Sequence, residues 1–294
     1  MAGTQQGRTV AVLGLGMIGG SLAHALRHSG FAGRILAYDR DRAALETGLA
    51  RGTIDAACSD LAAVLAAELV IIAAPNLAAA ELLSQLLALL DDRPGPVITD
   101  VASVKGNLAA RAGGAARYVP GHPIAGSERS GVAAADGGLF AGHRVILTPL
   151  PTQEPAALAL VRALWESVGA EVVEMAVDEH DAVLAATSHL PHMLAFCLVD
   201  ALAHSPRRDD LFRFAAGGFR DFTRIASSDP VMWRDVALAN REALLAAMDE
   251  FSARLATLRD AIEAGDGERL ARTFSAAKRA RDAFAHRDAD RHDV

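Results

Sequence analysis

The stretch TVAVLGLGMIGGSLAHALRH, residues 9–28, decides the fold of the first half of the chain. Its opening is a nearly continuous apolar run of strand length, and its end repeats apolar side chains on one helical face. Between them stands a GxGxxG turn, which binds a dinucleotide when a strand precedes it and a helix follows. Glycines there permit a tight turn, close approach of backbone amides to a pyrophosphate, and close helix packing. We therefore expect a dinucleotide to contact Gly14, Gly16, Met17, Ile18 and Gly19.

A second predicted strand, residues 34–38, ends directly before Asp39. A carboxylate at this position accepts hydrogen bonds from the ribose hydroxyls and repels a 2′-phosphate, so NAD is the expected cofactor. Arg40 and Arg42 weaken this preference because a guanidinium there can bind a 2′-phosphate, and NADP stays open. The other interpretation of Asp39 is a solvated residue that opens a turn.

Strands and helices keep alternating up to about residue 177, which is typical of a doubly wound, mostly parallel sheet of the Rossmann type. Ligands of such sheets bind outside the carboxyl ends of the strands. Pro75, Ser103 and His122 each follow a predicted strand, so we expect all three at one binding edge, with Pro75 and Ser103 near the cofactor. Capping the helix that begins near Lys105 is an alternative role for Ser103. The strands are expected at 69–74, 97–101, 118–120, 145–148 and 171–175, with helices at 77–90 and 154–168.

His122 follows the predicted strand 118–120 and precedes Pro123. Proline biases the preceding residue towards an extended backbone, which holds the imidazole at a strand end. A general base is usually presented in this way, although an ordinary loop histidine fits the same pattern.

Only helical periodicity follows residue 177, so we expect an α/β domain at 1–177 and an all-α domain at 178–294. Alanine and leucine occupy more than one face of these helices, which favours burial against a second copy and hence a homodimer. The helices are expected at 178–204, 208–219, 230–264 and 267–286.

Composition excludes several classes of protein. The 294 residues are 51% hydrophobic and 22% charged, which is a globular balance, and the net charge of −7 argues against nucleic-acid binding. Cys58 and Cys197 are far apart, so neither a disulfide framework nor a metal site is expected. No uninterrupted apolar run approaches about 18 residues and the first residues lack a signal sequence, so we expect a cytoplasmic protein without membrane contact.

Polar groups inside the helical half are not required by its packing. SHLPH, residues 188–192, interrupts a predicted helix, and its proline is expected to kink or open the backbone. Arg224 stands between Phe222 and Ile225, where an unpaired guanidinium would be costly. Its partner is either Asp221 or a carboxylate of the substrate.

Five motifs together resemble the prephenate and arogenate dehydrogenases of tyrosine biosynthesis. The resemblance spans residues 8 to 250 and implies a nucleotide-binding domain followed by a helical dimerisation domain. Some relatives carry a mutase or regulatory segment; none is expected here before residue 8 or after the helices, so tyrosine feedback would act at the active site. The motifs are GLGMIGGSLA at 14–23, DVASVKG at 100–106, GHPIAGSERSG at 121–131, SHLPH at 188–192 and GGFRDFTRIASSDPVMWRD at 217–235.

The resemblance implies oxidative decarboxylation of prephenate to 4-hydroxyphenylpyruvate, with hydride transfer to NAD. It makes His122 the base that takes the hydroxyl proton, and Ser103 the residue that hydrogen-bonds the histidine or the hydroxyl and the nicotinamide amide. It makes Arg224 the ligand of a substrate carboxylate, with His192, or alternatively His189, as a polar contact of the substrate. It makes Glu128 an acidic gate near the cleft and Asp221 a residue that orients an arginine, also across a dimer; both residues fit rim charges equally well.

Several alternatives stay open at this stage. The substrate is prephenate, arogenate, both, or an amino-substituted prephenate. A hydroxyacid or 6-phosphogluconate-type dehydrogenase would need a catalytic lysine in the helical half, and residues 178–270 contain none. A dinucleotide-sensing dimer without turnover would leave His122 and Arg224 without a common role.

Overall fold

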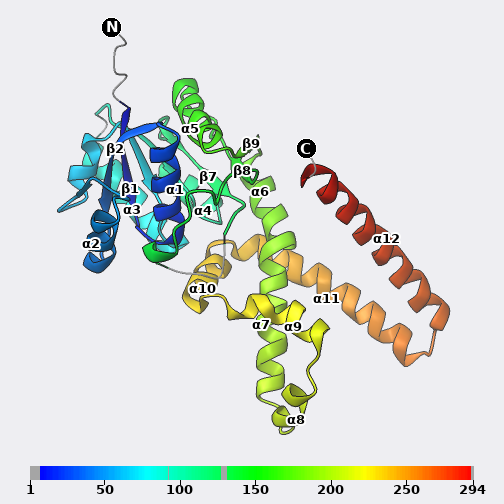
Figure 1. Ribbon diagram of the computed structural model, residues 1–294. Coiled ribbons are helices and arrows are strands. Elements are labelled where there is room, and N and C mark those ends of the chain that lie inside the picture. The colour runs from blue at the N-terminus through cyan, green and yellow to red at the C-terminus, as the bar shows by residue number, and fades with distance from the viewer. Residues whose placement is uncertain (1–6, 92, 127–130, 293–294) are drawn as a thin grey trace. The chain divides into compact units, whose positions relative to one another are not determined.

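The computed structural model describes residues 7–91, 93–126 and 131–292 (Figure 1). They form two compact units, of which the first ends at Leu244 and the second begins at Leu245. The first unit contains every described strand and the helices up to α10 (Pro230–Ala239).

The first unit is built on a six-stranded sheet in which every neighbouring pair of strands is parallel. The spatial order is β3-β2-β1-β4-β5-β6, so the direction of winding reverses between β1 and β4. This is the doubly wound order, and the predicted Rossmann-like fold class is confirmed. The strands are β1 Arg8–Leu13, β2 Ala32–Tyr38, β3 Ala56–Ala57, β4 Leu69–Ile72, β5 Val97–Asp100 and β6 Tyr118–Val119.

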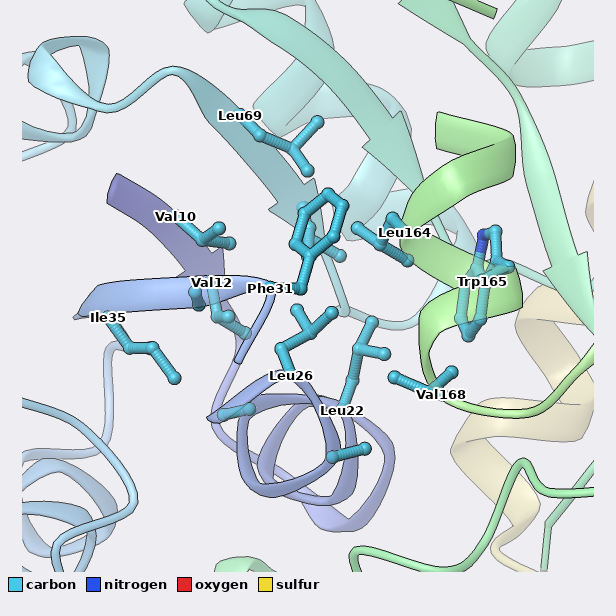
Figure 2. Close-up of a cluster of buried hydrophobic side chains, with 14 of the residues drawn as sticks. Val10, Val12, Leu22, Leu26, Phe31, Ile35, Leu69, Leu164, Trp165 and Val168 are labelled. Atoms are coloured by element: carbon cyan, nitrogen blue, oxygen red, sulfur yellow. The ribbon is translucent and has the colours of Figure 1, made fainter. Parts of the chain in front are cut away.

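The central strand β1 supplies side chains to both faces of this sheet because successive residues of a strand point in opposite directions. Val10 and Val12 enter the core beneath α1 and α5, where Figure 2 shows them with Phe31 and Trp165. Ala11 and Leu13 of β1 enter a second core, beneath α3 and α4. The helices of this part are α1 Met17–His28, α2 Arg42–Ala50, α3 Asn76–Leu90, α4 Gly106–Ala112 and α5 Pro155–Ser167, with short 3-10 helices η1 Ala62–Ala66 and η2 Val132–Ala134.

The chain then enters a separate three-stranded sheet. The sequence predicts that strand 118–120 ends before His122 and holds the imidazole at a strand end, and this expectation is wrong. The chain leaves the first sheet at Pro120, whose carbonyl accepts from Thr148 N at 3.1 Å. Proline has no N–H to continue the first ladder, so the chain crosses into the second sheet. His122 therefore lies inside a strand, opposite Ile146, and not at a strand end. The strands are β7 Gly121–Pro123, β8 Arg144–Leu147 and β9 Glu171–Glu174, with β7 antiparallel to β8 and β8 parallel to β9.

The first long helix of the second half is one continuous rod, α6 (Val177–Leu184), the π-helical turn η3 (Ala185–His189) and α7 (Leu190–Ala203). The expected effect of Pro191 appears here as the π turn directly before α7, which opens the backbone without ending the helix.

Two other helices are shorter than expected. The predicted helix 208–219 is divided into α8 Arg208–Arg213 and α9 Gly217–Thr223, followed by the 3-10 helix η4 Arg224–Ser227. The predicted helix 230–264 is also wrong as one helix, because it breaks at Asn240 into α10 and α11. The Asn240 side chain donates to Asp181 O at 2.8 Å, which fixes the break against α6. The remaining helices are α11 Arg241–Glu263 and α12 Gly267–His292.

The boundary predicted at residue 177 falls where the last described strand has ended and α6 begins. Whether it separates two domains stays a prediction, because α6 to α10 belong to the same compact unit as the sheets. Val104 packs with Trp233 and Val236 of α10, so an apolar cluster joins the two parts inside that unit.

Among the described residues one helix, Val177–Ala203, is long and apolar enough by length and composition to cross a membrane. This is weak evidence, because a core helix of a soluble protein passes the same test. The rod carries His180 and Asp181 into buried contacts with His122 and Lys105 of the first half of the chain.

A buried ion pair lies where the two sheets meet. The ammonium of Lys105, which has no exposed surface, contacts the Asp100 carboxylate and donates to Gly121 O at 2.5 Å. Tyr118 donates its hydroxyl to the same carboxylate at 2.6 Å. Burial lowers the pKa of Lys105, and the Asp100 charge opposes this change. The pair therefore connects β5, β6 and β7 at one point.

We predict that Lys105→Met lowers the free energy of unfolding by about 3–5 kcal/mol, because it leaves the Asp100 carboxylate buried without its cation. The matched control is Lys278→Met, since Lys278 pairs with Asp282 and its side chain is 75% exposed; we expect a change within about 0.5 kcal/mol. Chemical denaturation measures both. The double variant Lys105→Met/Asp100→Asn should recover part of the loss, and equal effects of the two lysine variants would contradict the interpretation.

Candidate functional site

The glycine-rich turn connects β1 to α1 at the point where the winding of the sheet reverses. Gly14 has a φ of +96°, and its amide donates to Tyr38 O at 2.9 Å. A Cβ atom at Gly14 would collide with Ala73 O, and one at Gly19 would collide with Gly14 O, so the fold itself requires both glycines. A Cβ atom at Gly16 would meet nothing within 4 Å. The space beside Gly16, at the start of α1, is the space that a pyrophosphate needs.

A first cavity, at the carboxyl edge of the sheet, has a volume of about 560 Å³ and includes Gly14, Gly16, Asp39, Arg40 and Pro75 in its wall. Asp39 is held rigidly at the end of β2. One carboxylate oxygen accepts from Leu15 N at 2.6 Å and the other from Asp41 N at 2.8 Å. A fixed carboxylate beside the glycine-rich turn suits the ribose hydroxyls of a dinucleotide, so these residues fit the predicted cofactor.

The second cavity has a volume of about 580 Å³ and brings together predicted residues from three parts of the sequence. Met17 and Ile18 come from the glycine-rich turn and the start of α1. Ser103 follows β5 and His122 lies within β7, whereas His192 and Arg224 come from the helical half. The rest of the wall includes Val101, Pro123, Ile124, Ala125, Gly126, Leu184, Thr187, Ser188, Ile225, Ser228, Met232 and Trp233.

Several sequence-based expectations about these residues need correction or lie outside the structure. Glu128 lies outside the described residues. Asp221 is exposed and is not among the described residues that line the cavity. Arg224 is exposed too, so our argument that its burial would demand an anion was wrong, although its position on the cavity wall agrees with contact to a substrate.

Ser103 does not cap α4, so that alternative is wrong. The cap is Lys105, which makes no side-chain capping bond. Instead, Asp181 from α6 accepts hydrogen bonds from Lys105 N at 2.9 Å and Gly106 N at 2.7 Å. A carboxylate is favourable at the start of a helix because two free N–H groups point towards it. The hydroxyl of Ser103 is therefore not used for the helix, and Ser103 lines the second cavity.

His122 is a buried, neutral imidazole on the cavity wall. Burial is the largest influence and the Lys105 ammonium the next, and together they lower the pKa of His122 well below its usual value. Its Nδ1 atom lies 2.9 Å from Nε2 of His180, which is fully buried. A neutral imidazole can accept a proton from a ligand that reaches its free nitrogen.

His192 and His189 have different surroundings, although they lie three residues apart. His192 lines the cavity, stacks on Trp233 with 3.5 Å between ring centroids, and donates from Nδ1 to Ser188 O at 3.0 Å. His189 is only 1% exposed and accepts from Asn240 Nδ2 at 3.0 Å. Burial lowers the pKa of His189 to about 4. Of the two, the structure puts His192 on the cavity.

Sequence reasoning did not single out Lys105, His180, Asp181, Trp233 or Asn240. Lys105 and Trp233 stand inside the motifs at 100–106 and 217–235, so the sequence contained a signal for them. His180 and Asp181 stand in no such motif. Their contacts join residues 58 to 76 positions apart, and helical periodicity does not predict such contacts.

Residues 22–174 match the family model described as prephenate dehydrogenase, nucleotide-binding domain, and residues 176–276 match the one described as prephenate dehydrogenase, dimerization domain.

Three relatives cover nearly the whole chain. Prephenate dehydrogenase of Bacillus subtilis is 39% identical over 93% of this chain and 75% of its own length. Cyclohexadienyl dehydrogenase of Zymomonas mobilis is 35% identical over 92% of this chain and 94% of its own. The crystal structure of Aquifex aeolicus prephenate dehydrogenase in complex with hydroxyphenyl propionate and NAD+ has a TM-score of 0.88 and 38% identity, covering 95% of this chain and 98% of that one.

We predict that stability falls as the pH drops from about 6.5 to about 4. In this window His189 is protonated in the unfolded chain, where its pKa is near 6.5, but stays neutral in the folded protein. The unfolded state therefore binds more protons and is favoured, by about 3 kcal/mol for this residue. His122, His24 and His192 have lowered pKa values and act in the same direction.

Denaturation midpoints at pH 7 and pH ~4.5 measure this effect. His189→Gln should reduce the difference between the two pH values. His143→Gln should leave it unchanged, because His143 is exposed. A pH dependence that is the same in both variants would show that His189 is not responsible.

Proposed function

The chain belongs to the prephenate dehydrogenase family, and from this premise we propose that it catalyses the NAD-dependent oxidative decarboxylation of prephenate to 4-hydroxyphenylpyruvate in tyrosine biosynthesis. It is an oxidoreductase with a nucleotide-binding Rossmann domain. The observation that carries the proposed reaction is the shared cavity of His122 and Arg224, together with Met17 and Ile18 from the glycine-rich turn.

The substrate class follows from the chemistry of the second cavity. Prephenate has a ring hydroxyl and two carboxylates. The cavity wall combines an imidazole that is neutral at physiological pH with a guanidinium, and a guanidinium forms paired hydrogen bonds with a carboxylate. A second imidazole, that of His192, is fixed by Trp233 and supplies a further polar contact.

The chain's own residues have three tasks in this reaction. His122 takes the proton of the ring hydroxyl, Arg224 binds a carboxylate, and Ser103 hydrogen-bonds the hydroxyl or the nicotinamide amide. Bound NAD supplies the hydride acceptor, and its fit rests on Gly16, Asp39 and the first cavity.

The proton balance is closed if His122 first accepts the hydroxyl proton and later returns it. Loss of the hydroxyl proton and of a hydride turns the ring carbon into a carbonyl, which draws the electrons released when CO2 leaves. The resulting phenolate then takes a proton, which His122 can return. No net proton is released, so the histidine is neutral again at the end of each turnover.

We also propose that the protein acts as a cytoplasmic homodimer with a domain boundary at residues 177/178 and without a nucleic-acid or membrane partner. Exposed apolar side chains support the dimer. Within the second unit Leu245, Met248, Leu255 and Ile262 follow helical spacing along α11 and are 37% to 61% exposed. Such a stripe needs a partner surface.

The alternative is that the protein oxidises arogenate, or that it accepts both prephenate and arogenate. The two molecules differ where prephenate has a keto group and arogenate an ammonium, and the relatives of this chain include a cyclohexadienyl dehydrogenase. The proposal of prephenate rests on the cationic character of the cavity wall, where Arg224 disfavours a second positive charge.

The decisive experiment is a four-way assay of the purified chain with prephenate or arogenate and with NAD or NADP, following absorbance of the reduced nicotinamide. We expect the highest kcat/KM for prephenate with NAD, because Asp39 repels a 2′-phosphate. In the same assay His122→Asn should lower kcat by roughly 10²–10⁴ while NAD binding survives. The exposed His143→Asn is the matched control and should keep full activity.

Each other outcome of the assay has a definite meaning. Preference for arogenate would replace the proposed substrate. Binding of NAD without turnover of either substrate would favour the sensing dimer. Full activity of His122→Asn would remove His122 from the role of base.

We further predict that Arg224→Ala raises the KM for prephenate about 10- to 100-fold, which corresponds to the roughly 1.5–3 kcal/mol of a charge-assisted hydrogen bond. The effect on kcat should be smaller, since the carboxylate is bound in both the ground state and the transition state. Arg213→Ala, on the exposed end of α8, serves as control. An unchanged KM in Arg224→Ala would exclude this residue from substrate binding.

A further inference from the structure

His122 is the first member of a buried chain of three ionisable side chains. Its Nδ1 atom lies 2.9 Å from Nε2 of His180, and Nδ1 of His180 lies 2.8 Å from a carboxylate oxygen of Asp181. The two imidazole rings meet edge to face, at 64° and 5.1 Å between centroids, which is compatible with a hydrogen bond between ring nitrogens. His180 is fully buried and Asp181 nearly so, so water does not compete for these bonds.

The direction of each hydrogen bond follows from the carboxylate. An ionised carboxylate only accepts, so a neutral His180 carries its proton on Nδ1 and leaves Nε2 as an acceptor. His122 must then donate from its own Nδ1. A neutral imidazole carries one proton, so Nε2 of His122 is left with a free lone pair.

Asp181 is held in its ionised form and in place by groups from other elements. Lys105 N and Gly106 N donate to its two oxygens, and its own carbonyl accepts from Asn240 Nδ2. The hydrogen bonds from His180 and from these amides outweigh burial and lower the pKa of Asp181. The chain of hydrogen bonds therefore ends on a fixed negative charge.

We propose that His180 and Asp181 are positioning residues that hold His122 in the Nδ1–H tautomer, so that its Nε2 atom accepts the hydroxyl proton of the substrate. This inference rests on the proposed role of His122 as the base. When Nε2 takes the proton, the positive charge on His122 is balanced through His180 by the Asp181 carboxylate. Returning the proton to the phenolate restores the starting tautomer without rotation of the ring.

Three variants and one control test the relay in the full-length protein. Asp181→Asn allows an amide to donate towards His180, which reverses both hydrogen bonds and puts the proton of His122 on Nε2. His180→Leu removes the acceptor altogether. His180→Gln keeps an acceptor near the position of Nε2. Asp178→Asn, at an exposed residue of the same helix, is the matched control.

We expect Asp181→Asn and His180→Leu to lower kcat for prephenate about 10- to 10³-fold, with little change in KM or NAD binding. His180→Gln should restore part of the lost kcat, and the control should match the wild type. The pH profile adds a readout that a purely structural role would not move. Loss of the Asp181 charge makes His122 harder to protonate, so the acid limb of kcat should move to lower pH in Asp181→Asn.

The groups that face His122 and influence the acid limb of kcat are Lys105, His180 on α6 and His189 on the π turn. None of the three is changed in Asp181→Asn, so a shift of the limb reports the lost carboxylate. An acid limb that stays in place while kcat falls would overturn the relay.

Nitrogen-15 NMR of histidine-labelled protein reads the tautomer directly and needs no substrate. We expect Nδ1–H at His122 in the wild type and a change to Nε2–H in Asp181→Asn and His180→Leu. Nε2–H in the wild type would overturn the relay, as would wild-type kcat in both variants. Absence of turnover in the wild type would instead overturn the proposed function, so the two failures are distinguishable.

Discussion

The ammonium group of Lys105 joins the two sheets of the first unit at the point where the chain crosses from one to the other. It contacts Asp100 at the end of β5 and the carbonyl of Gly121 at the start of β7. Because a buried charge is costly without a partner, these groups fix one another. The strand β7 is therefore anchored at Gly121, the residue before His122, and the position of the imidazole depends on the ion pair of Lys105 and Asp100.

The same cation also acts on His122 electrostatically. Its charge disfavours a second positive charge nearby, and with burial it keeps the imidazole neutral and ready to accept a proton. A base with a strongly lowered pKa is weak, however. The carboxylate of Asp181, reached through His180, works in the opposite direction and stabilises the protonated imidazole. The site thus combines a cation that keeps the base free with an anion that helps it act.

The local sequence pattern was sufficient to predict part of this structure. The apolar run of β1 and the glycines after it predicted the Rossmann core, because strand periodicity and turn geometry are properties of neighbouring residues. The common cavity of His122 and Arg224 was predicted through family resemblance, since no periodicity relates residues that far apart. The exposure of Arg224 and the position of His122 within β7 were missed, because both depend on the crossing at Pro120 and on tertiary packing.

The relay was beyond sequence reasoning for a similar reason. A charged residue such as aspartate in a helix is expected on the solvated face, and only the packing of α6 against α4 turns His180 and Asp181 inwards. The break at Asn240 was hidden too, because asparagine within a helical pattern gives no sign that its side chain will bind the carbonyl of a distant helix.

The two compact units divide the work unequally. Every described residue of the second cavity and of the relay lies before Leu245, so the first unit contains the described groups that we propose act on the substrate. Within residues 245–285 Ala261 is the one buried side chain, and most of the large apolar residues there are exposed, while Leu258 and Leu270 are half-buried. A pair of helices with so small a core cannot be stable through its own packing. The second unit therefore needs a partner surface for stability, whereas the chemistry needs α6 to stay packed against the sheets. The proposed association of two chains and the proposed positioning of the base make separate demands on the helical half. The rod Val177–Ala203 has buried polar residues in α6 and exposed apolar residues along α7, so it suits both.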